Sequence, residues 1–143
     1  LPEVNQDFSG PGCYSSGWGK DVFGQEGAYQ QILKSIVLPA VPNPDCERAL
    51  RTTRLGSFFK LHSSFMCAGG EAGIDTCTGD GGSPLVCPDP LNPERYVQAG
   101  IVAWGIGCGQ DGIPGVYAAV SRAVPWIEQE LQSNFDFDVR TQA

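Results

Sequence analysis

Residues 77–87 read CTGDGGSPLVC, a glycine-rich loop that runs straight into a short apolar segment. The apolar segment, from Ser83 to Cys87, is predicted to be a β-strand. Gly81 lies in the middle of the loop and has no side chain, so it supplies no attacking group for covalent catalysis. Any chemistry of this loop therefore depends on its backbone or on neighbouring residues.

The rest of the chain has the same pattern of short apolar runs separated by turn residues. It contains 19 glycines and 11 prolines, which is typical of an antiparallel β-protein with many turns. We predict five further strands, at Cys13–Lys20, Gln31–Leu38, Phe65–Ala68, Tyr96–Trp104 and Gly115–Val120.

Two helices are predicted. The first begins at Asn43, where an amide side chain can cap the helix and the next residue is proline, and it ends near Gly56. The second runs from about Ser121 to Gln132, and its Pro125 is tolerable only in the first turn. Residues 134–143 are predicted to form a flexible tail.

Composition excludes several classes of function. The chain has 143 residues, is 41% hydrophobic and carries a net charge of −7. An acidic protein is a poor ligand for nucleic acid or for anionic membrane surfaces. We find no apolar run near the ~18 residues of a membrane span. We also find no signal peptide, as expected of a mature, processed chain.

The six cysteines indicate disulfide bonds rather than a metal site. They form no Cys-x-x-Cys pair, and His62 is the only histidine, whereas zinc ligands usually come in close pairs. We therefore expect no metal and no cofactor. Disulfides indicate an oxidising compartment, and hence a secreted protein. Spacing alone leaves about 15 possible pairings.

Other motifs lie on both sides of the loop, in a consistent order between about residues 13 and 132. They read CYSSGWG from Cys13, FMCAG from Phe65, GIVAWG from Gly100 and PGVY from Pro114. Together with the loop, they resemble the second half of the trypsin/chymotrypsin family of serine proteases. The resemblance implies an all-β fold for residues 1–143, namely the C-terminal antiparallel β-barrel of a two-barrel domain, with one short helix and a C-terminal helix.

In that family the catalytic histidine and aspartate precede the serine in the chain. The resemblance therefore implies an upstream companion, the first β-barrel, that belongs to the same precursor. His62 lies in the wrong sequence context to be the catalytic histidine, and we interpret it as an ordinary loop residue.

The resemblance also places Gly81 in the position of the nucleophilic serine, which implies an inactive protein. Ser83 is the alternative nucleophile, but it lies two residues away, while attack needs reacting atoms about 3–3.5 Å apart. Ala103 stands where active members carry a serine that supports the catalytic aspartate. Both departures favour a pseudoprotease.

Substrate recognition is better preserved than catalysis. The resemblance makes Asp75 the acidic floor of a specificity pocket for Lys or Arg side chains. It makes Gly79 and Asp80 a remnant of the oxyanion loop. The pocket and its groove would be completed by Trp104, Gly105 and Gly115.

The family pattern further implies three disulfides: Cys13–Cys87, Cys46–Cys67 and Cys77–Cys108. In the narrower sense, the chain is most similar to the clip-domain serine protease homologues of arthropod haemolymph, because of Gly81 and the motif AWGIGCG from Ala103.

This narrower resemblance implies a secreted, non-catalytic binding cofactor in an innate-immune protease cascade, in prophenoloxidase activation and melanisation. Its partners would be a cascade protease or prophenoloxidase, together with an upstream half that can include a clip domain. The alternatives are an active trypsin-like endopeptidase that uses Ser83, and an inhibitor that sequesters substrates.

Overall fold

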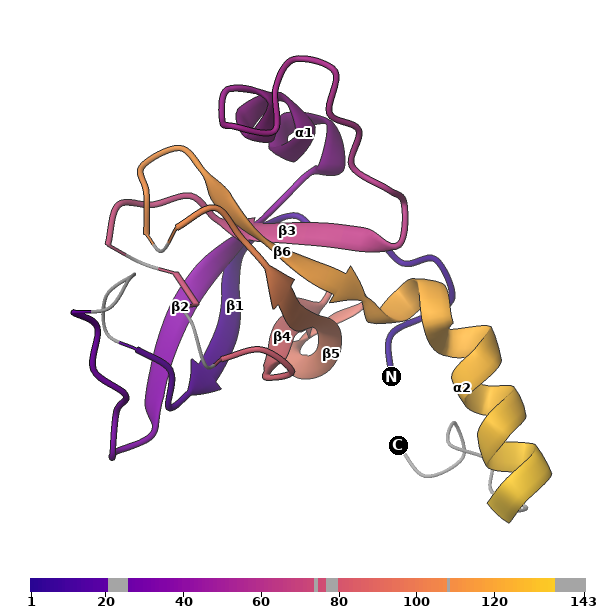
Figure 1. Cartoon of the computed structure of the whole chain (residues 1–143). Helices are drawn as coiled ribbons and strands as arrows, with labels where there is room; N and C mark the ends of the chain where they lie inside the picture. Colours follow the sequence, from indigo (N-terminus) through magenta and orange to yellow (C-terminus); the bar gives the residue numbers. More distant parts are fainter. Residues whose placement is uncertain (21–25, 74, 77–79, 108, 136–143) are drawn as a thin grey trace.

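Antiparallel strands close into a barrel in the computed structural model of this chain (Figure 1). The structure describes residues 1–20, 26–73, 75–76, 80–107 and 109–135. Around the barrel, the strands that it describes follow the order β1-β2-β3-β6-β5-β4. The prediction of an all-β barrel with one short helix and a C-terminal helix is confirmed.

The strand and helix bounds are close to those expected. The elements are β1 Gly10–Gly17, β2 Lys34–Val41, α1 Asn43–Arg51, β3 Phe65–Gly69, β4 Pro84–Asp89, β5 Asn92–Trp104, β6 Pro114–Ala119 and α2 Val120–Phe135. Strand β1 lies three residues before its predicted position and β2 lies three residues after, while β5 begins four residues earlier than predicted.

The barrel closes where β1 pairs with β4. Tyr14 lies opposite Val86 and Ser15 lies opposite Leu85, so this seam is short compared with the β1–β2 ladder, which continues to Gly17. Side chains alternate along β1: Ser15 is buried, while Tyr14 faces outward and is 40% exposed.

Two apolar clusters hold the fold together. One fills the barrel and includes Leu38, Leu85 and the fully buried Tyr117. The other lies between α1 and the barrel wall, and its buried members include Leu50 and Val116. Each buried aliphatic or aromatic side chain stabilises the folded state by about 1.5–3 kcal/mol.

The start of α1 differs from the prediction. The helix begins at Asn43, but no side chain caps it. Asn43 instead donates its amide Nδ2–H to the carbonyl of Phe65, 2.9 Å away, at the start of β3. The helix also ends at Arg51, earlier than predicted, because the residues that follow fold into turns in which Thr52 and Thr53 donate back to the helix.

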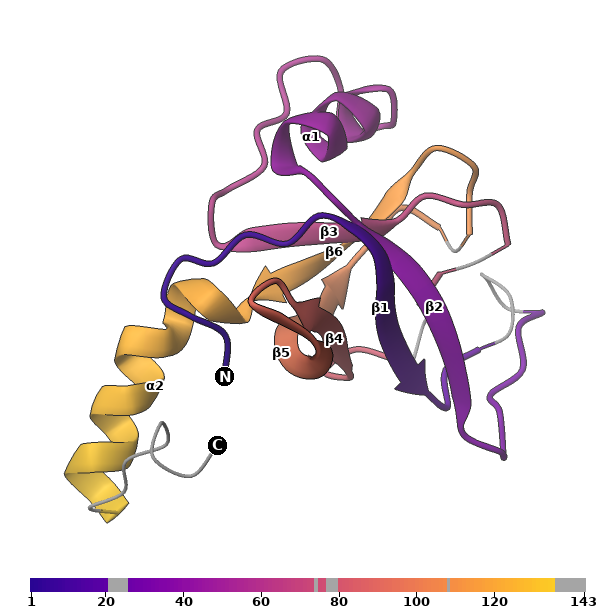
Figure 2. The same ribbon diagram turned by 180° about the vertical axis from the view of Figure 1, so that it is seen from behind.

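Helix α2 begins directly after β6, so Pro125 lies in its second turn rather than in the first turn that was predicted. Proline has no N–H to donate to the carbonyl four residues earlier, which is that of Ser121. The backbone N–H of Asn5 takes its place at 3.0 Å, and the N-terminal segment therefore runs beside the start of α2 (Figure 2). No helix among the described residues is both long and apolar enough to cross a membrane.

Candidate functional site

The loop that precedes β4 contains Gly81, and this position is open. An added Cβ would meet no atom within 4 Å, and Gly81 is exposed. The loop is anchored on β5 by Gly82 N–H donating to the Val102 carbonyl and Val102 N–H donating to the Ser83 carbonyl, at 3.0 and 2.9 Å. A serine side chain would therefore fit at residue 81, but glycine offers no oxygen there.

Ser83 points away from that open position. Its Oγ lies 3.3 Å from where a Cβ of Gly17 would stand, at the end of β1. This arrangement places the Ser83 hydroxyl beside β1. His62 is exposed in the segment before β3, and its Nδ1 lies 2.8 Å from the hydroxyl of Ser64 and accepts the Ser64 backbone N–H at 3.1 Å. Local bonds therefore occupy this ring nitrogen.

The carboxylate of Asp80 reaches the end of β1. Gly19 donates its backbone N–H to Asp80 Oδ1 at 2.8 Å. A Cβ on Gly17 would stand 2.0 Å from Asp80 Oδ1, and a Cβ on Gly19 would stand 2.5 Å from Asp80 Oδ2. Only glycine at both positions leaves room for the carboxylate. Gly79, the other predicted residue of the oxyanion loop, lies outside the described residues.

Asp75 is half-buried between two loops. Its Oδ1 accepts the Thr76 N–H at 2.8 Å, and its Oδ2 accepts the Gly109 N–H at 3.3 Å. Burial raises the pKa of the Asp75 carboxyl above its usual value, and the two amide bonds oppose this effect. A Cβ on Gly115 would lie 2.9 Å from Asp75 Oδ1, so the glycine is needed for the carboxylate to sit there.

The two loops around Asp75 are joined by backbone hydrogen bonds. Gly73 N–H donates to the Gly109 carbonyl, and Gly112 N–H donates to the Gly70 carbonyl, both at 2.8 Å. Behind them, the hydroxyls of Thr76 and the buried Tyr117 lie 3.2 Å apart. The predicted pocket floor is therefore held by a fixed hydrogen-bond network.

Trp104 lies at the end of β5, and its ring packs inward. The ring makes edge-to-face contacts with Phe59 and Phe65, each with centroids 6.0 Å apart. Gly105 follows it and is exposed, with the Cα of Gly115 3.9 Å from where its Cβ would stand. The structure thus brings Asp75, Gly105 and Gly115 together, while the ring of Trp104 belongs to the apolar cluster under α1.

Two disulfides link the elements around this region. Cys13 on β1 is bonded to Cys87 on β4, and Cys46 on α1 is bonded to Cys67 on β3; these are pairs that the family resemblance implies. The expected third pair, Cys77–Cys108, lies outside the described residues. No group of three or more possible metal ligands occurs in the part of the chain that the structure describes.

Sequence reasoning missed two features. It did not anticipate a hollow of about 320 Å³ between the N-terminal segment and the starts of α1 and α2, at which Asp7 forms an ion pair with Arg122. It also gave no role to Phe58, whose side chain is 94% exposed. Phe58 and Phe59 are adjacent in the sequence, and no periodic pattern indicates which of them faces the solvent.

Comparison with known protein families gives a match over residues 1–127 to the trypsin family. The chain belongs to the trypsin family. Among curated proteins, it is 60% identical over 132 residues to "Phenoloxidase-activating factor 2" of Galleria mellonella, and 57% identical over 121 residues to "Inactive CLIP domain-containing serine protease A3" of Aedes aegypti. It is also 45% identical over 141 residues to "Inactive CLIP domain-containing serine protease A28" of Anopheles gambiae.

These alignments cover most of this trypsin-family chain but less than half of each relative. They include 92%, 84% and 95% of this chain, and 44%, 25% and 36% of the respective relatives. The resemblance to clip-domain serine protease homologues is confirmed over the barrel, and two of these three relatives carry the word "inactive" in their names.

Proposed function

We propose that this chain is the C-terminal half of a secreted, catalytically inactive serine protease homologue that acts as a binding cofactor in an innate-immune protease cascade. The observation that carries the proposal is Gly81, which stands where the family needs a nucleophilic serine. The names of its relatives, inactive proteases and a phenoloxidase-activating factor, support the same reading and favour prophenoloxidase activation as the step it assists.

The partner within its own precursor would be an upstream half with the first β-barrel, and a clip domain can precede it. That relatives such as the Galleria protein extend well beyond the matched region supports this arrangement. Disulfides in the barrel support an extracellular location such as haemolymph. No step in this proposal uses a metal or a cofactor.

The first test concerns catalysis. The full-length protein is expected to remain unlabelled by a fluorophosphonate probe, because residue 81 offers no hydroxyl and the Ser83 hydroxyl lies toward β1. An active trypsin-family protease in the same experiment serves as the positive control. If the wild-type protein is labelled and Ser83→Ala is not, the proposal of an inactive homologue is wrong. The result would favour an active protease that uses Ser83 as its nucleophile.

A second test concerns the cofactor role. Full-length protein added to purified prophenoloxidase and its activating protease is expected to increase the yield of active phenoloxidase with a saturable dose dependence. The control is the same reaction with an unrelated secreted protein of similar charge. A dose-dependent decrease would instead favour the inhibitor that sequesters substrates.

The Asp75 pocket gives a pH-dependent prediction for binding of a small cation. Benzamidine stays protonated across pH 4–8, so its affinity for the full-length protein depends on whether Asp75 is ionised. Because burial raises the pKa of Asp75, affinity is expected to rise as the pH increases through that raised pKa and to level off above it. Calorimetric titration at several pH values measures this.

Asp75→Asn is the matched control, since it keeps the shape of the side chain and removes its charge. Both the affinity and its pH dependence are expected to fall in this variant. Equal binding by the wild type and the variant at every pH would mean that Asp75 is not the floor of an open cation pocket.

A further inference from the structure

The segment between α1 and β3 displays an apolar side chain to solvent. Phe58 is 94% exposed, more than any other large apolar residue in the described part of the chain. An aromatic ring left in water loses the stabilisation that burial would give it. Residues 52–60, which contain this ring, are called the Phe58 loop below.

Backbone bonds and packing fix the Phe58 loop. Gly56 N–H donates to the Thr53 carbonyl at 3.1 Å, and Phe59 N–H donates to the Gly56 carbonyl at 3.2 Å. Arg51 Nε–H donates to the Phe59 carbonyl at 2.8 Å. The Phe59 ring packs against Trp104. Its neighbour Phe58 therefore faces the solvent because the fold of the loop holds it there.

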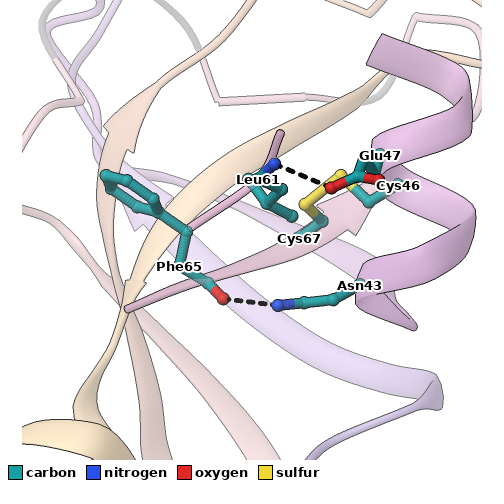
Figure 3. The surroundings of a disulfide bond; sticks show 6 residues. All are labelled: Asn43, Cys46, Glu47, Leu61, Phe65 and Cys67. Atoms are coloured by element: carbon teal, nitrogen blue, oxygen red, sulfur yellow. Dashed lines mark hydrogen bonds between the residues drawn. A yellow bond between two sulfur atoms is a disulfide. The ribbon is translucent and has the colours of Figure 1, made fainter. Parts of the chain in front are cut away.

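The ends of the segment are secured as well. Figure 3 shows Glu47 on α1 accepting the backbone N–H of Leu61, at 2.9 Å, beside the Cys46–Cys67 disulfide. Glu47 also forms an ion pair with Arg51, at 2.8 Å. The Phe58 loop therefore begins and ends on anchored residues, which lowers the entropy that a partner must remove on binding.

The sequence segment that contains Phe58 carries a charge opposite in sign to that of the whole chain. Four of the nine basic residues fall between Arg48 and Lys60, a stretch without Asp or Glu, whereas the rest of the chain has five basic and 16 acidic residues. Arg48 and Arg51 pair with carboxylates of α1. Arg54 and Lys60 are exposed and belong to none of the ion pairs found among the described residues.

We propose that the Phe58 loop is a docking surface for a protein that presents an apolar pocket rimmed by Asp and Glu side chains. The pocket would receive the Phe58 ring, and its carboxylates would face Arg54 and Lys60. Buried aromatic anchors surrounded by complementary charge are the usual centres of protein interfaces. A sulfated polysaccharide would satisfy the cations but would leave the ring in water.

This inference rests on the proposed cofactor function, because it takes the docked protein to be a component of the cascade. The test uses full-length protein in the prophenoloxidase activation reaction. Phe58→Ser and the double variant Arg54→Glu/Lys60→Glu are each expected to raise the concentration needed for half-maximal stimulation by about tenfold or more. None of the three side chains is buried, so the barrel should fold normally.

Matched controls change the same chemistry elsewhere. Leu91→Ser removes a side chain that is 83% exposed in the β4–β5 turn, and Lys34→Glu reverses an exposed charge at the start of β2. Both are expected to behave like the wild type. If the wild type stimulates the reaction and the Phe58 and Arg54/Lys60 variants do so equally well, the docking surface is refuted while the cofactor function stands.

A binding experiment keeps the inference testable if stimulation itself is absent. Benzoylphenylalanine placed at position 58 of the full-length protein is irradiated with purified prophenoloxidase and the activating protease. A cross-link to one of them, near acidic residues and absent when the probe is at position 91, supports the docking surface. The docking surface is refuted if no cross-link forms or if the cross-link lies within the same molecule. It is also refuted if the protein is retained on heparin in a way that depends on Arg54 and Lys60 but not on Phe58.

Discussion

Replacing Cys13 and Cys87 together by alanine is expected to lower the free energy of unfolding by about 4 kcal/mol. The two residues are separated by 74 positions, so their bond removes much of the freedom of the unfolded chain. It also lies beside the short β1–β4 seam, where Tyr14 pairs with Val86 and Ser15 pairs with Leu85. Hydrogen exchange of the slowest amides of β1 and β4, followed by mass spectrometry of the full-length protein, measures the loss.

The matched control is the pair Cys46→Ala and Cys67→Ala, whose sequence separation is only 21. Loop closure predicts a smaller loss there, of about 3 kcal/mol. If removal of the Cys46–Cys67 bond lowered the free energy of unfolding more than removal of the Cys13–Cys87 bond, the explanation would be wrong. The restriction of the unfolded chain would then not be the main source of stabilisation by the Cys13–Cys87 bond.

Gly19→Ala is expected to destabilise the protein by about 3 kcal/mol. The new methyl group would stand 2.5 Å from Asp80 Oδ2 and Cγ. The carboxylate must then move, and it would lose the N–H of Gly19 that it now accepts at 2.8 Å. Because Asp80 begins the turn that contains Gly81, faster hydrogen exchange at residues 80–83 should accompany the loss.

A double-mutant cycle separates crowding from a general effect of alanine at residue 19. Gly19 does not have a positive φ, so alanine fits its backbone once the carboxylate is gone. In an Asp80→Ala background, Gly19→Ala is therefore expected to cost little. An equal loss of unfolding free energy in both backgrounds would show that the methyl group added by Gly19→Ala does not clash with the Asp80 carboxylate.

The barrel could be predicted from the sequence because its signals are local. Apolar runs such as the one in β4 are bounded by glycine and proline, and they mark the strands well. The prediction started β1 too late, since Gly10, Pro11 and Gly12 read as a turn. In the structure Gly10 pairs with Ala40, and an irregularity before Cys13 absorbs the extra residues.

Strand β2 shows the opposite difficulty. Its predicted end at Leu38 reflects Pro39, which has no N–H for a ladder. The strand continues to Val41 because β1 stays paired on both sides of Pro39: Leu38 lies opposite Cys13 and Ala40 lies opposite Gly10. Pro39 thus falls at the irregularity in the β1–β2 register, and a proline is tolerated at such a bulge, which no local pattern reveals.

The candidate site was predictable only where a family motif names the residue. Asp75 and Gly115 were expected to lie together, and the structure places them in contact. The hydrogen bond between Gly19 and Asp80 links residues that are 61 positions apart in the sequence. It depends on the three-dimensional fold, and no periodic pattern in the sequence indicates it. The outward orientation of Phe58 depends likewise on the tertiary packing of Phe59 against Trp104.

The hydrogen bond from Asn5 to Ser121 has a mechanical consequence. It fastens the N-terminal segment before β1 to α2, at the place where Pro125 leaves a gap in the hydrogen bonds of the helix. Tension applied at Leu1 would be carried first by α2. Strand β1 would bear load only after the hydrogen bond between Asn5 and Ser121 had broken. Movements of the upstream half proposed above would thus be transmitted to α2 before they disturb the barrel.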